Sequence, residues 1–148
     1  MIKKNIIFDF AGVIDRSDPD DILALSKKFK LFIISNSYFQ TIENFLVNKN
    51  IKNCFTEILG LDVGGSKAER FKMLFIKYSL KSEEVLFITD SVSDIQEAKI
   101  AQLGFIIAIN SGMQTAAELT AAGPNIVVNN FKELEKAINI WDQNTISQ

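Results

Sequence analysis

Apolar residues in this chain form short, nearly continuous runs that alternate with segments in which apolar residues recur every three or four positions. Continuous runs are typical of strands covered on both faces, and the longer spacing is typical of amphipathic helices. The runs predict strands at 5–10, 31–35, 57–61, 85–89, 105–109 and 126–128. Because strands and helices alternate, the pattern predicts a three-layer α/β domain with a central parallel sheet.

Start and stop signals bound the helices between these strands. Asp18 precedes Pro19, which is a cap followed by proline at the first helical position, and Ser66 to Glu69 matches a capping box. Ser37 is a further candidate cap, as is Ser91. The predicted helices span 19–29, 38–48, 67–78, 92–102, 113–122 and 131–141. Residues 1–141 then form one domain, and 142–148 form a polar C-terminal tail that we expect to fray.

Composition excludes several classes of function. The 148 residues carry a formal net charge of −2 without a basic block, so we expect no nucleic-acid partner. No apolar run is long enough for a membrane span, and no leader is recognisable, so we expect no membrane partner and a cytoplasmic location. The single cysteine fits a reducing compartment, and the lack of histidine excludes Ser-His and Cys-His catalysis.

Carboxylates stand at the ends of two of the predicted strands. Asp9 follows the first apolar run and Asp90 follows the fourth, with Asp94 one helical turn later. Ligands bind outside the carboxyl ends of parallel strands, so two carboxylates that meet there predict a site for a hard cation such as Mg²⁺. A carboxylate at this position can also attack phosphorus. Alternatively, Asp9 only shapes the turn before Gly12, and Asp94 is only the partner of the Ser91 cap.

Three further residues are candidates for binding phosphate. Ser35 ends the second predicted strand and Asn36 follows it, where a hydroxyl and free helix N–H groups could cradle an anion. The same pair is also an ordinary cap sequence. Lys67 lies in the first turn of its helix, where the dipole disfavours a cation, which indicates a phosphate or carboxylate partner. A solvated surface lysine is the alternative.

Together these residues resemble the haloacid dehalogenase superfamily of phosphohydrolases. The four segments that carry the resemblance occur in order along the chain: Ile-Ile-Phe-Asp-Phe-Ala-Gly-Val at 6–13, Phe-Ile-Ile-Ser-Asn at 32–36, Lys67, and Phe-Ile-Thr-Asp-Ser-Val-Ser-Asp at 87–94. The resemblance implies a Rossmann-like core and a magnesium-dependent phosphatase. It implies that Asp9 is the nucleophile and Asp90 a Mg²⁺ ligand, that Ser35 and Asn36 bind the transferring group, and that Lys67 neutralises the phosphoaspartate.

Two departures from the family pattern matter. Ala11 stands where family phosphatases carry a second aspartate that acts as general acid and base. The backbone carbonyl at this position, which binds the metal in the family, is still present. We therefore expect proton transfer to be lost, which is worth about 10²–10⁴-fold in rate. The second departure is that the segments between the motifs leave no room for a cap domain. Members of this kind act on large substrates or take a lid from a neighbouring subunit.

The sequence thus supports a slow, Mg²⁺-dependent phosphomonoester hydrolase that acts through an aspartyl-phosphate, with Asp94 supporting Lys67 or metal-bound water. Its substrate would be a small-molecule phosphoester or a phosphorylated macromolecule, and a homo-oligomer is an open alternative to a monomer. A second hypothesis is a catalytically impaired domain that binds metal and phosphate, or a partner protein. Phosphonate cleavage is a third hypothesis, because first motifs with alanine occur in that branch of the family.

Overall fold

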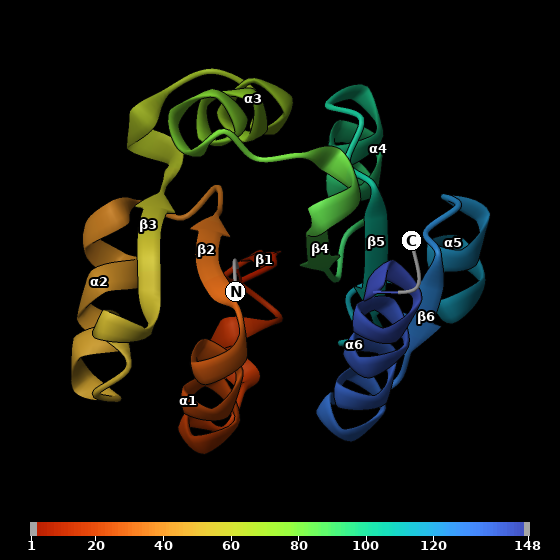
Figure 1. Ribbon diagram of the computed structural model, residues 1–148, viewed down its shortest axis with the longest axis horizontal. Coiled ribbons are helices and arrows are strands. Elements are labelled where there is room, and N and C mark those ends of the chain that lie inside the picture. Colours follow the sequence, from red (N-terminus) through yellow and green to blue (C-terminus); the bar gives the residue numbers. More distant parts are fainter. Residues whose placement is uncertain (1–2, 147–148) are drawn as a thin grey trace.

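Six strands form one sheet in the order β3-β2-β1-β4-β5-β6, and every neighbouring pair is parallel. The computed structural model describes residues 3–146, and of residues 145 and 146 only the backbone. The strands are β1 (Asn5–Phe8), β2 (Lys30–Ile34), β3 (Phe55–Leu59), β4 (Val85–Thr89), β5 (Phe105–Ile109) and β6 (Ile126–Val128). The predicted α/β class with a parallel sheet is confirmed (Figure 1).

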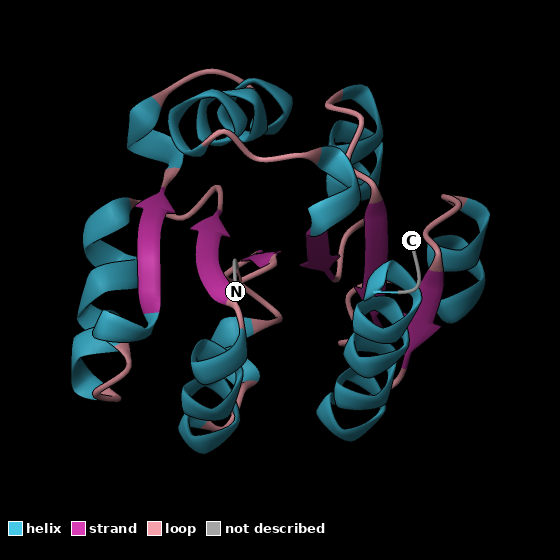
Figure 2. Cartoon of the chain, in the orientation of Figure 1, coloured by secondary structure: helices cyan, strands magenta, loops and turns pink. Residues whose placement is uncertain are grey.

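Helices alternate with the strands along the chain, as Figure 2 shows by colour. They are α1 (Pro19–Lys28), α2 (Phe39–Asn48), α3 (Lys67–Tyr78), α4 (Val92–Ile100), α5 (Ala116–Ala121) and α6 (Phe131–Ile146). Buried residues of α1, α2 and α6 belong to one hydrophobic cluster, and those of α3, α4 and α5 belong to the other. The helices therefore form one layer on each face of the sheet.

The alternation of side chains along β1 divides the core between these two layers. Ile6 and Phe8 are fully buried in the cluster with α1, α2 and α6, whereas Ile7 is fully buried in the cluster with α3, α4 and α5. Successive side chains of a strand point to opposite faces, so a strand covered on both sides must be apolar at every position. This is why the chain shows continuous apolar runs rather than an alternating pattern.

The order of the strands reverses between β1 and β4. From β1 the chain continues outward to β2 and β3, and from β4 it continues in the other direction to β5 and β6. At such a reversal the loops that leave the two central strands diverge and open a crevice at their carboxyl ends. Phe8 pairs with Ile88 in register, so the residues that follow β1 and β4 meet at this crevice.

Three predicted strands have different bounds. β1 ends at Phe8 instead of residue 10, β2 lies one residue nearer the N-terminus than predicted, and β3 lies two residues nearer. The early end of β1 has a local cause, because the Asp9 carboxylate accepts a 2.8 Å hydrogen bond from the N–H of Phe10 and the chain turns away from the sheet there. The other three strands have the predicted bounds.

Two helix starts differ from the prediction. Ser37 does not cap α2, which begins at Phe39 with no cap from its own preceding side chain. Instead the Asp62 carboxylate, from the loop after β3, accepts a 3.0 Å hydrogen bond from the N–H of Phe39. α5 begins at Ala116 rather than at residue 113, because Thr115 and Glu118 form a capping box. α1 and α4 end one and two residues earlier than predicted.

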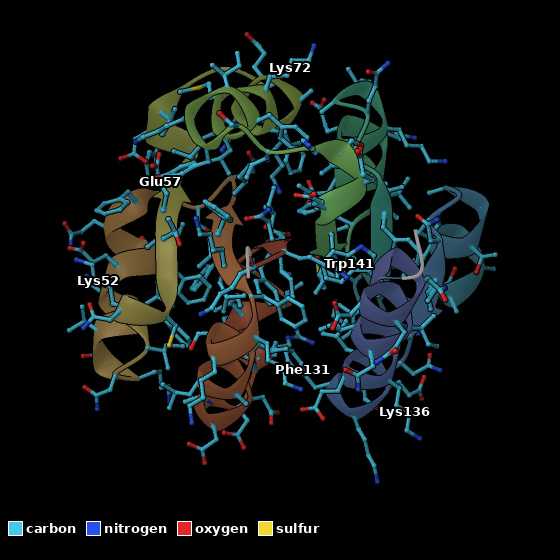
Figure 3. The ribbon with its side chains drawn as sticks, in the orientation of Figure 1. Lys52, Glu57, Lys72, Phe131, Lys136 and Trp141 are labelled. Atoms are coloured by element: carbon cyan, nitrogen blue, oxygen red, sulfur yellow. The ribbon has the colours of Figure 1, made fainter. Side chains whose placement is uncertain are left out.

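The last helix is longer than predicted. α6 continues past Trp141 to Ile146, so Asp142 lies in the helix and not in a polar tail. Lys4 Nζ donates to the backbone carbonyl of Asp142 at 2.7 Å and to its carboxylate at 2.8 Å, which fastens this turn to the start of β1. Trp141, labelled in Figure 3, is 1% exposed and contacts the ring of Phe29. Residues 147 and 148 of the expected tail lie outside the described residues.

Within residues 3–146, no helix has both the length and the apolar character needed to cross a bilayer.

We expect the two capping boxes, at the starts of α3 and α5, to contribute similar amounts to the free energy of unfolding. Ser66 Oγ accepts from the N–H of Glu69, and Thr115 Oγ1 accepts from the N–H of Glu118, each at 3.1 Å. We expect Ser66→Ala and Thr115→Ala each to lower the free energy of unfolding by about 0.5–2 kcal/mol, because each leaves helix N–H groups without a side-chain acceptor. Urea unfolding followed by circular dichroism measures this. Ser26→Ala, inside α1, is the control and should stay within about 0.5 kcal/mol; equal values for all three variants would contradict the prediction.

Candidate active site

Asp9 is the first residue beyond β1, and its side chain is buried. Its N–H donates to the carbonyl of Ile88 at 2.9 Å, which keeps the residue aligned with β4 although the strand has ended. Burial raises the pKa of Asp9 to about 7; the charge of Lys67 opposes this rise, and the nearby charges of Asp94 and Asp90 add to it. The Asp9 carboxylate therefore lies where negative charge is crowded and a cation is favoured.

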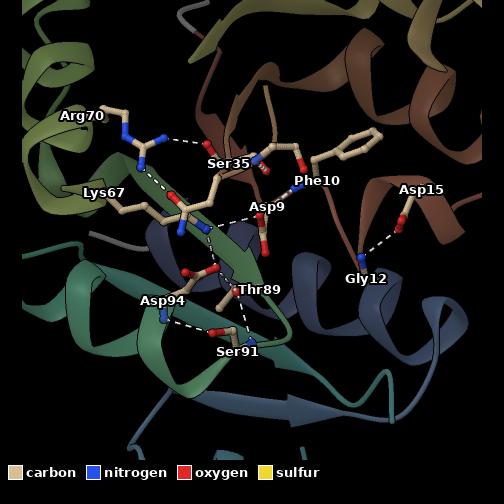
Figure 4. A network of polar contacts seen from close by, with 12 residues as sticks. Asp9, Phe10, Gly12, Asp15, Ser35, Lys67, Arg70, Thr89, Ser91 and Asp94 are labelled. Carbon is tan, nitrogen blue, oxygen red and sulfur yellow. Dashed lines mark hydrogen bonds and ion pairs between the residues drawn. The ribbon is translucent and has the colours of Figure 1, made fainter. Parts of the chain in front are cut away.

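Lys67 links two of these carboxylates (Figure 4). Its Nζ lies 2.6 Å from Asp94 Oδ2 and 3.3 Å from Asp9 Oδ1, and its side chain is 5% exposed. The sequence predicted an anionic partner for Lys67, because the positive end of the helix dipole disfavours a lysine in the first turn of α3. The partner is a pair of carboxylates, and the alternative of a solvated surface lysine is wrong.

Asp94 combines the two roles that the sequence left open. Its N–H donates to Ser91 Oγ at 3.3 Å, which makes Asp94 the partner of the α4 cap. Its Oδ2 accepts from Lys67 Nζ and, at 2.8 Å, from Thr89 Oγ1. Thr89 ends β4 and is fully buried, so its hydroxyl fixes the Asp94 carboxylate toward Lys67.

Asp90 follows β4 and lies against the loop that leaves β1. Gly12 has a φ of +81°, and a Cβ on this residue would lie 1.9 Å from Asp90 Oδ2. Only glycine allows the loop to adopt this conformation and to approach the carboxylate so closely. The same oxygen, Asp90 Oδ2, accepts a 2.6 Å hydrogen bond from Ser111 Oγ. Asp9 and Asp90 follow two neighbouring strands, and the charge of Asp90 adds to the rise that burial causes in the pKa of Asp9.

Ser35 and Asn36 stand at the carboxyl end of β2, beside β1. Ser35 is 1% exposed and its hydroxyl accepts from the N–H of Ser37 at 3.1 Å. Arg70 holds both residues, because its Nη1 donates to the Ser35 carbonyl at 2.5 Å and its Nη2 donates to Asn36 Oδ1 at 2.6 Å. The backbone at the end of β2 is therefore fixed by a guanidinium from α3.

Sequence reasoning missed Arg70, Thr89 and Ser111 as parts of this site. Arg70 had a signal, because it lies three residues after Lys67 and four residues before Leu74, which is fully buried, so these residues share a helix face. An arginine on the apolar face of an amphipathic helix needs a buried acceptor. Ser111 had only its position shortly after β5, and the bond from its hydroxyl to Asp90 depends on how two loops meet.

The donor atoms of the site fit Mg²⁺. Asp9, Asp90 and Asp94 are all buried, and Lys67 is the cation in contact with two of them. Asp90 lies close enough to Asp9 to raise its pKa, and it occupies the space that a Cβ on residue 12 would fill. Within the described part of the chain, no three His, Cys, Asp or Glu side chains are arranged to hold a metal ion. Mg²⁺ needs only one or two carboxylates, since it keeps several waters.

Residues 20–108, more than half of the chain, match the family described as haloacid dehalogenase-like hydrolases. The matched region contains Ser35, Lys67, Asp90 and Asp94, whereas Asp9 lies before it. No protein of curated function matches the sequence.

Solved structures of similar fold include a Bacteroides fragilis protein described as a haloacid dehalogenase-like hydrolase, with 27% identity over 78% of this chain and a TM-score of 0.72. A haloacid dehalogenase-like family hydrolase from Streptococcus pneumoniae has 16% identity over 92% of this chain and a TM-score of 0.73. A predicted phosphoglycolate phosphatase from Haemophilus somnus has 21% identity over 80% and a TM-score of 0.70. This chain spans 56%, 98% and 54% of these three proteins, respectively.

We expect Lys67→Met to be strongly destabilising. Removing Lys67 Nζ leaves the buried carboxylates of Asp9 and Asp94 without their counter-charge, which costs about 3–5 kcal/mol when one partner of a buried pair is removed. Urea unfolding at neutral pH in EDTA measures the loss. Lys72→Met, an exposed lysine on the same helix, should change the stability by less than about 0.5 kcal/mol. A loss for Lys67→Met as small as that of Lys72→Met would show that the lysine does not hold the site together.

Proposed function

This chain belongs to the haloacid dehalogenase-like hydrolases, and we propose that it is a Mg²⁺-dependent phosphomonoesterase that works through an aspartyl-phosphate. One buried arrangement supports the proposal: Lys67 Nζ contacts Asp9 and Asp94 at the point where the strand order reverses. This is where ligands bind in α/β sheets. A buried carboxylate paired with lysine there provides a nucleophile and a neutralising charge in one place.

Asp9 is the nucleophile in the proposed reaction. One of its carboxylate oxygens attacks phosphorus, an O–P bond forms, and the bond between phosphorus and the leaving oxygen breaks. The leaving oxygen takes a proton from solvent, since Ala11 has none to give. A water molecule then attacks phosphorus and passes a proton to solvent, the bond between phosphorus and the Asp9 oxygen breaks, and inorganic phosphate leaves while the Asp9 carboxylate is restored. Lys67, which already lies beside Asp9 Oδ1, compensates the negative charge on the phosphorylated aspartate.

Mg²⁺, when bound, would neutralise the phosphoryl oxygens and stabilise the charge that develops during transfer. Asp9, Asp90 and the backbone carbonyl of Ala11 would hold it. Asp94 would act indirectly, through Lys67 or through metal-bound water. Ser111 and Gly12 keep Asp90 in place, since one donates to its carboxylate and the other lets the loop lie against it.

Ser35, Asn36 and Lys67 would bind the transferring phosphoryl group. The Ser35 hydroxyl lies at the carboxyl end of the strand next to β1, and Lys67 reaches the same region from α3. Arg70 positions Ser35 and Asn36 without needing to touch substrate, because its donors are directed to their oxygen atoms. Binding of phosphate by fixed donors costs little reorganisation during the reaction.

Ala11 sets the expected rate. It is exposed in the loop between Asp9 and Gly12 and offers no group that can transfer a proton. The next carboxylate along the chain, Asp15, is exposed and accepts a 2.8 Å hydrogen bond from the N–H of Gly12. We therefore propose slow turnover, limited by protonation of the leaving oxygen, and faster turnover for esters whose leaving groups need no proton.

The same absence of an acid favours a second candidate, a domain that binds metal and phosphate, or a partner protein, without turnover. The two candidates share the residues that bind Mg²⁺ and phosphate, and they differ only in whether Asp9 is phosphorylated. Both a small phosphoester and a phosphorylated macromolecule are candidate substrates. Between β1 and β3 the described residues form only short helices and the strand β2. A second copy of the chain is our candidate for a lid over the site.

Hydrolysis of phosphoesters tests the leading candidate. With Mg²⁺ we expect phosphate release from a panel of p-nitrophenyl phosphate, 2-phosphoglycolate and a phosphopeptide, and we expect EDTA to abolish it. Asp9→Asn should lower kcat by about 10³-fold or more, because the amide cannot attack phosphorus. Asp20→Asn, an exposed residue in α1, is the control and should match the wild type. Undiminished hydrolysis by Asp9→Asn would contradict the proposed nucleophile.

Restoring a carboxylate distinguishes the two candidates. Ala11→Asp should raise kcat by about 10²–10⁴-fold for alkyl phosphates, whose leaving oxygens need a proton, and much less for p-nitrophenyl phosphate. Ala11→Asn has the same size without the acid and should give no such gain. If the wild type shows no basal turnover but still binds Mg²⁺ and beryllofluoride by calorimetry, the non-catalytic candidate is the correct one.

A further inference from the structure

A small pocket lies next to Asp90, at the same edge of the sheet as the candidate active site. Its volume is about 260 Å³, and its lining includes Gly12, Arg16, Asn110, Ser111, Asn129 and Asn130, which come from three loops, together with the last residue of β5 and the first residue of α6. These loops follow β1, β5 and β6, so the pocket opens at the carboxyl ends of the strands. None of its residues has a role in the phosphoryl-transfer steps described above, apart from the support that Gly12 and Ser111 give to Asp90.

Two of the lining residues touch Asp90 directly. Ser111 Oγ donates to Asp90 Oδ2 at 2.6 Å, and the backbone of Gly12 lies so close that a Cβ would be 1.9 Å from the same oxygen. The pocket and the candidate metal site therefore share a wall. A phosphoester bound at Asp9 and Asp90 could extend its alcohol portion into this space.

Arg16 gives the pocket its charge. Its Nη1 donates to the backbone carbonyl of Ser111 at 2.6 Å, so the guanidinium is fixed at the pocket by the residue that also contacts Asp90. Within residues 3–146, no carboxylate lies within ion-pair distance of Arg16. A guanidinium has five N–H donors and matches carboxylate and phosphate groups with two parallel bonds. Most of the donors of Arg16 remain available to a ligand.

The other polar groups of the pocket are neutral amides. Asn110 Oδ1 accepts from the N–H of Gly112, which leaves the Asn110 amide N–H groups without an acceptor among the described residues. Asn129 and Asn130 each direct one amide N–H to the Glu133 carboxylate. The lining thus offers one guanidinium and several amide N–H groups that have no acceptor among the described residues. A lining of this kind favours an anion.

Resting on the function proposed above, we propose that this pocket binds the leaving-group side of the substrate and that Arg16 selects esters whose alcohol carries a second anionic group. That group is a carboxylate or a second phosphate, since both match the guanidinium. The volume lies below the range of about 300–1,000 Å³ that is usual for pockets of drug-sized ligands, which favours an alcohol of a few carbon atoms. Arg16 is then a specificity-determining residue that contacts the substrate away from phosphorus.

Three esters with the same two-carbon skeleton test the proposal. 2-Phosphoglycolate carries a carboxylate, ethylene glycol bisphosphate carries a second phosphate, and 2-hydroxyethyl phosphate carries a neutral hydroxyl. Arg16→Ala should lower kcat/KM for the anionic esters by about 10–100-fold, the worth of hydrogen bonds to a charged group, and should change the neutral ester by less than about threefold. Arg16→Lys should restore only part of the preference, because the ammonium lacks the planar fork.

Lys72→Ala is the matched control, because it also removes one positive charge from an exposed position. Figure 3 labels Lys72 and Phe131 on opposite sides of the molecule, so Lys72 lies far from the pocket. We expect this variant to lower kcat/KM for none of the three esters. An equal loss in Arg16→Ala and Lys72→Ala would mean that net charge matters and the pocket does not, and an equal loss on neutral and anionic esters would also overturn the proposal.

A binding measurement separates this proposal from the proposed function. Dissociation constants of the three esters are measured by calorimetry with Mg²⁺ on Asp9→Asn and on Asp9→Asn combined with Arg16→Ala.

The outcomes differ for the two proposals. If the protein hydrolyses no ester, but the anionic esters bind at least tenfold more tightly than the neutral ester and lose this advantage with Arg16→Ala, the pocket proposal is supported and the proposed catalytic function is wrong. If hydrolysis occurs without any dependence on Arg16, the function stands and the pocket proposal fails. If the anionic esters have no advantage in either measurement, the pocket proposal is wrong. Loss confined to one anionic ester identifies carboxylate or phosphate as the group recognised.

Discussion

The ion pairs of Lys67 are the interaction on which this site depends. Three carboxylates are buried within a few residues of the ends of β1 and β4, where low polarity strengthens their mutual repulsion. Among the described residues Lys67 is the cation that forms ion pairs with them, through Asp9 and Asp94. Burial is the main reason why the pKa of Asp9 is raised to about 7, and the charges of Asp94 and Asp90 add to the rise although Lys67 opposes it. A divalent cation would offset the negative charge of these carboxylates. The crowding of negative charge, which is unfavourable in the fold alone, would therefore favour the binding of Mg²⁺.

The position of Lys67 is set by helix α3 as a whole. Ser66 and Glu69 fix the first turn through the capping box, and Lys67 follows the cap directly. Arg70 comes one turn later on the same face and fastens the end of β2. Phe71 then packs edge-on against Phe87 of β4, with ring centroids 4.8 Å apart. A single helix therefore carries the polar contacts at the carboxyl ends of three strands and the apolar contacts that hold it against the sheet. A shift in its register would disturb all of them together.

The sequence was sufficient for features that depend on local pattern. Continuous apolar runs identified all six strands, and strand ends identified Asp9 and Asp90, because a parallel sheet brings such ends together without further information. It was insufficient where the partner lies on a distant loop. Asp62 caps α2 in place of Ser37, and Lys4 binds the turn of α6 at Asp142, and neither contact has a signature within its own segment. Ser111 is of the same kind, since its bond to Asp90 exists only because the loops after β4 and β5 meet.

The missing carboxylate at Ala11 and the unpaired guanidinium of Arg16 bear on the same problem. A phosphatase must deal with the negative charge that develops on the leaving oxygen, and a general acid does so by supplying a proton. A fourth carboxylate beside Asp9, Asp90 and Asp94 would supply that proton but would add to the crowding of negative charge. A fixed cation on the leaving-group side acts differently, because it orients the alcohol portion of the ester and supplies no proton. Arg16 is held on that side by Ser111, the residue that also orients Asp90. An anionic group of the alcohol bound to Arg16 would thus hold the leaving group in place during transfer, while its leaving oxygen still takes its proton from solvent.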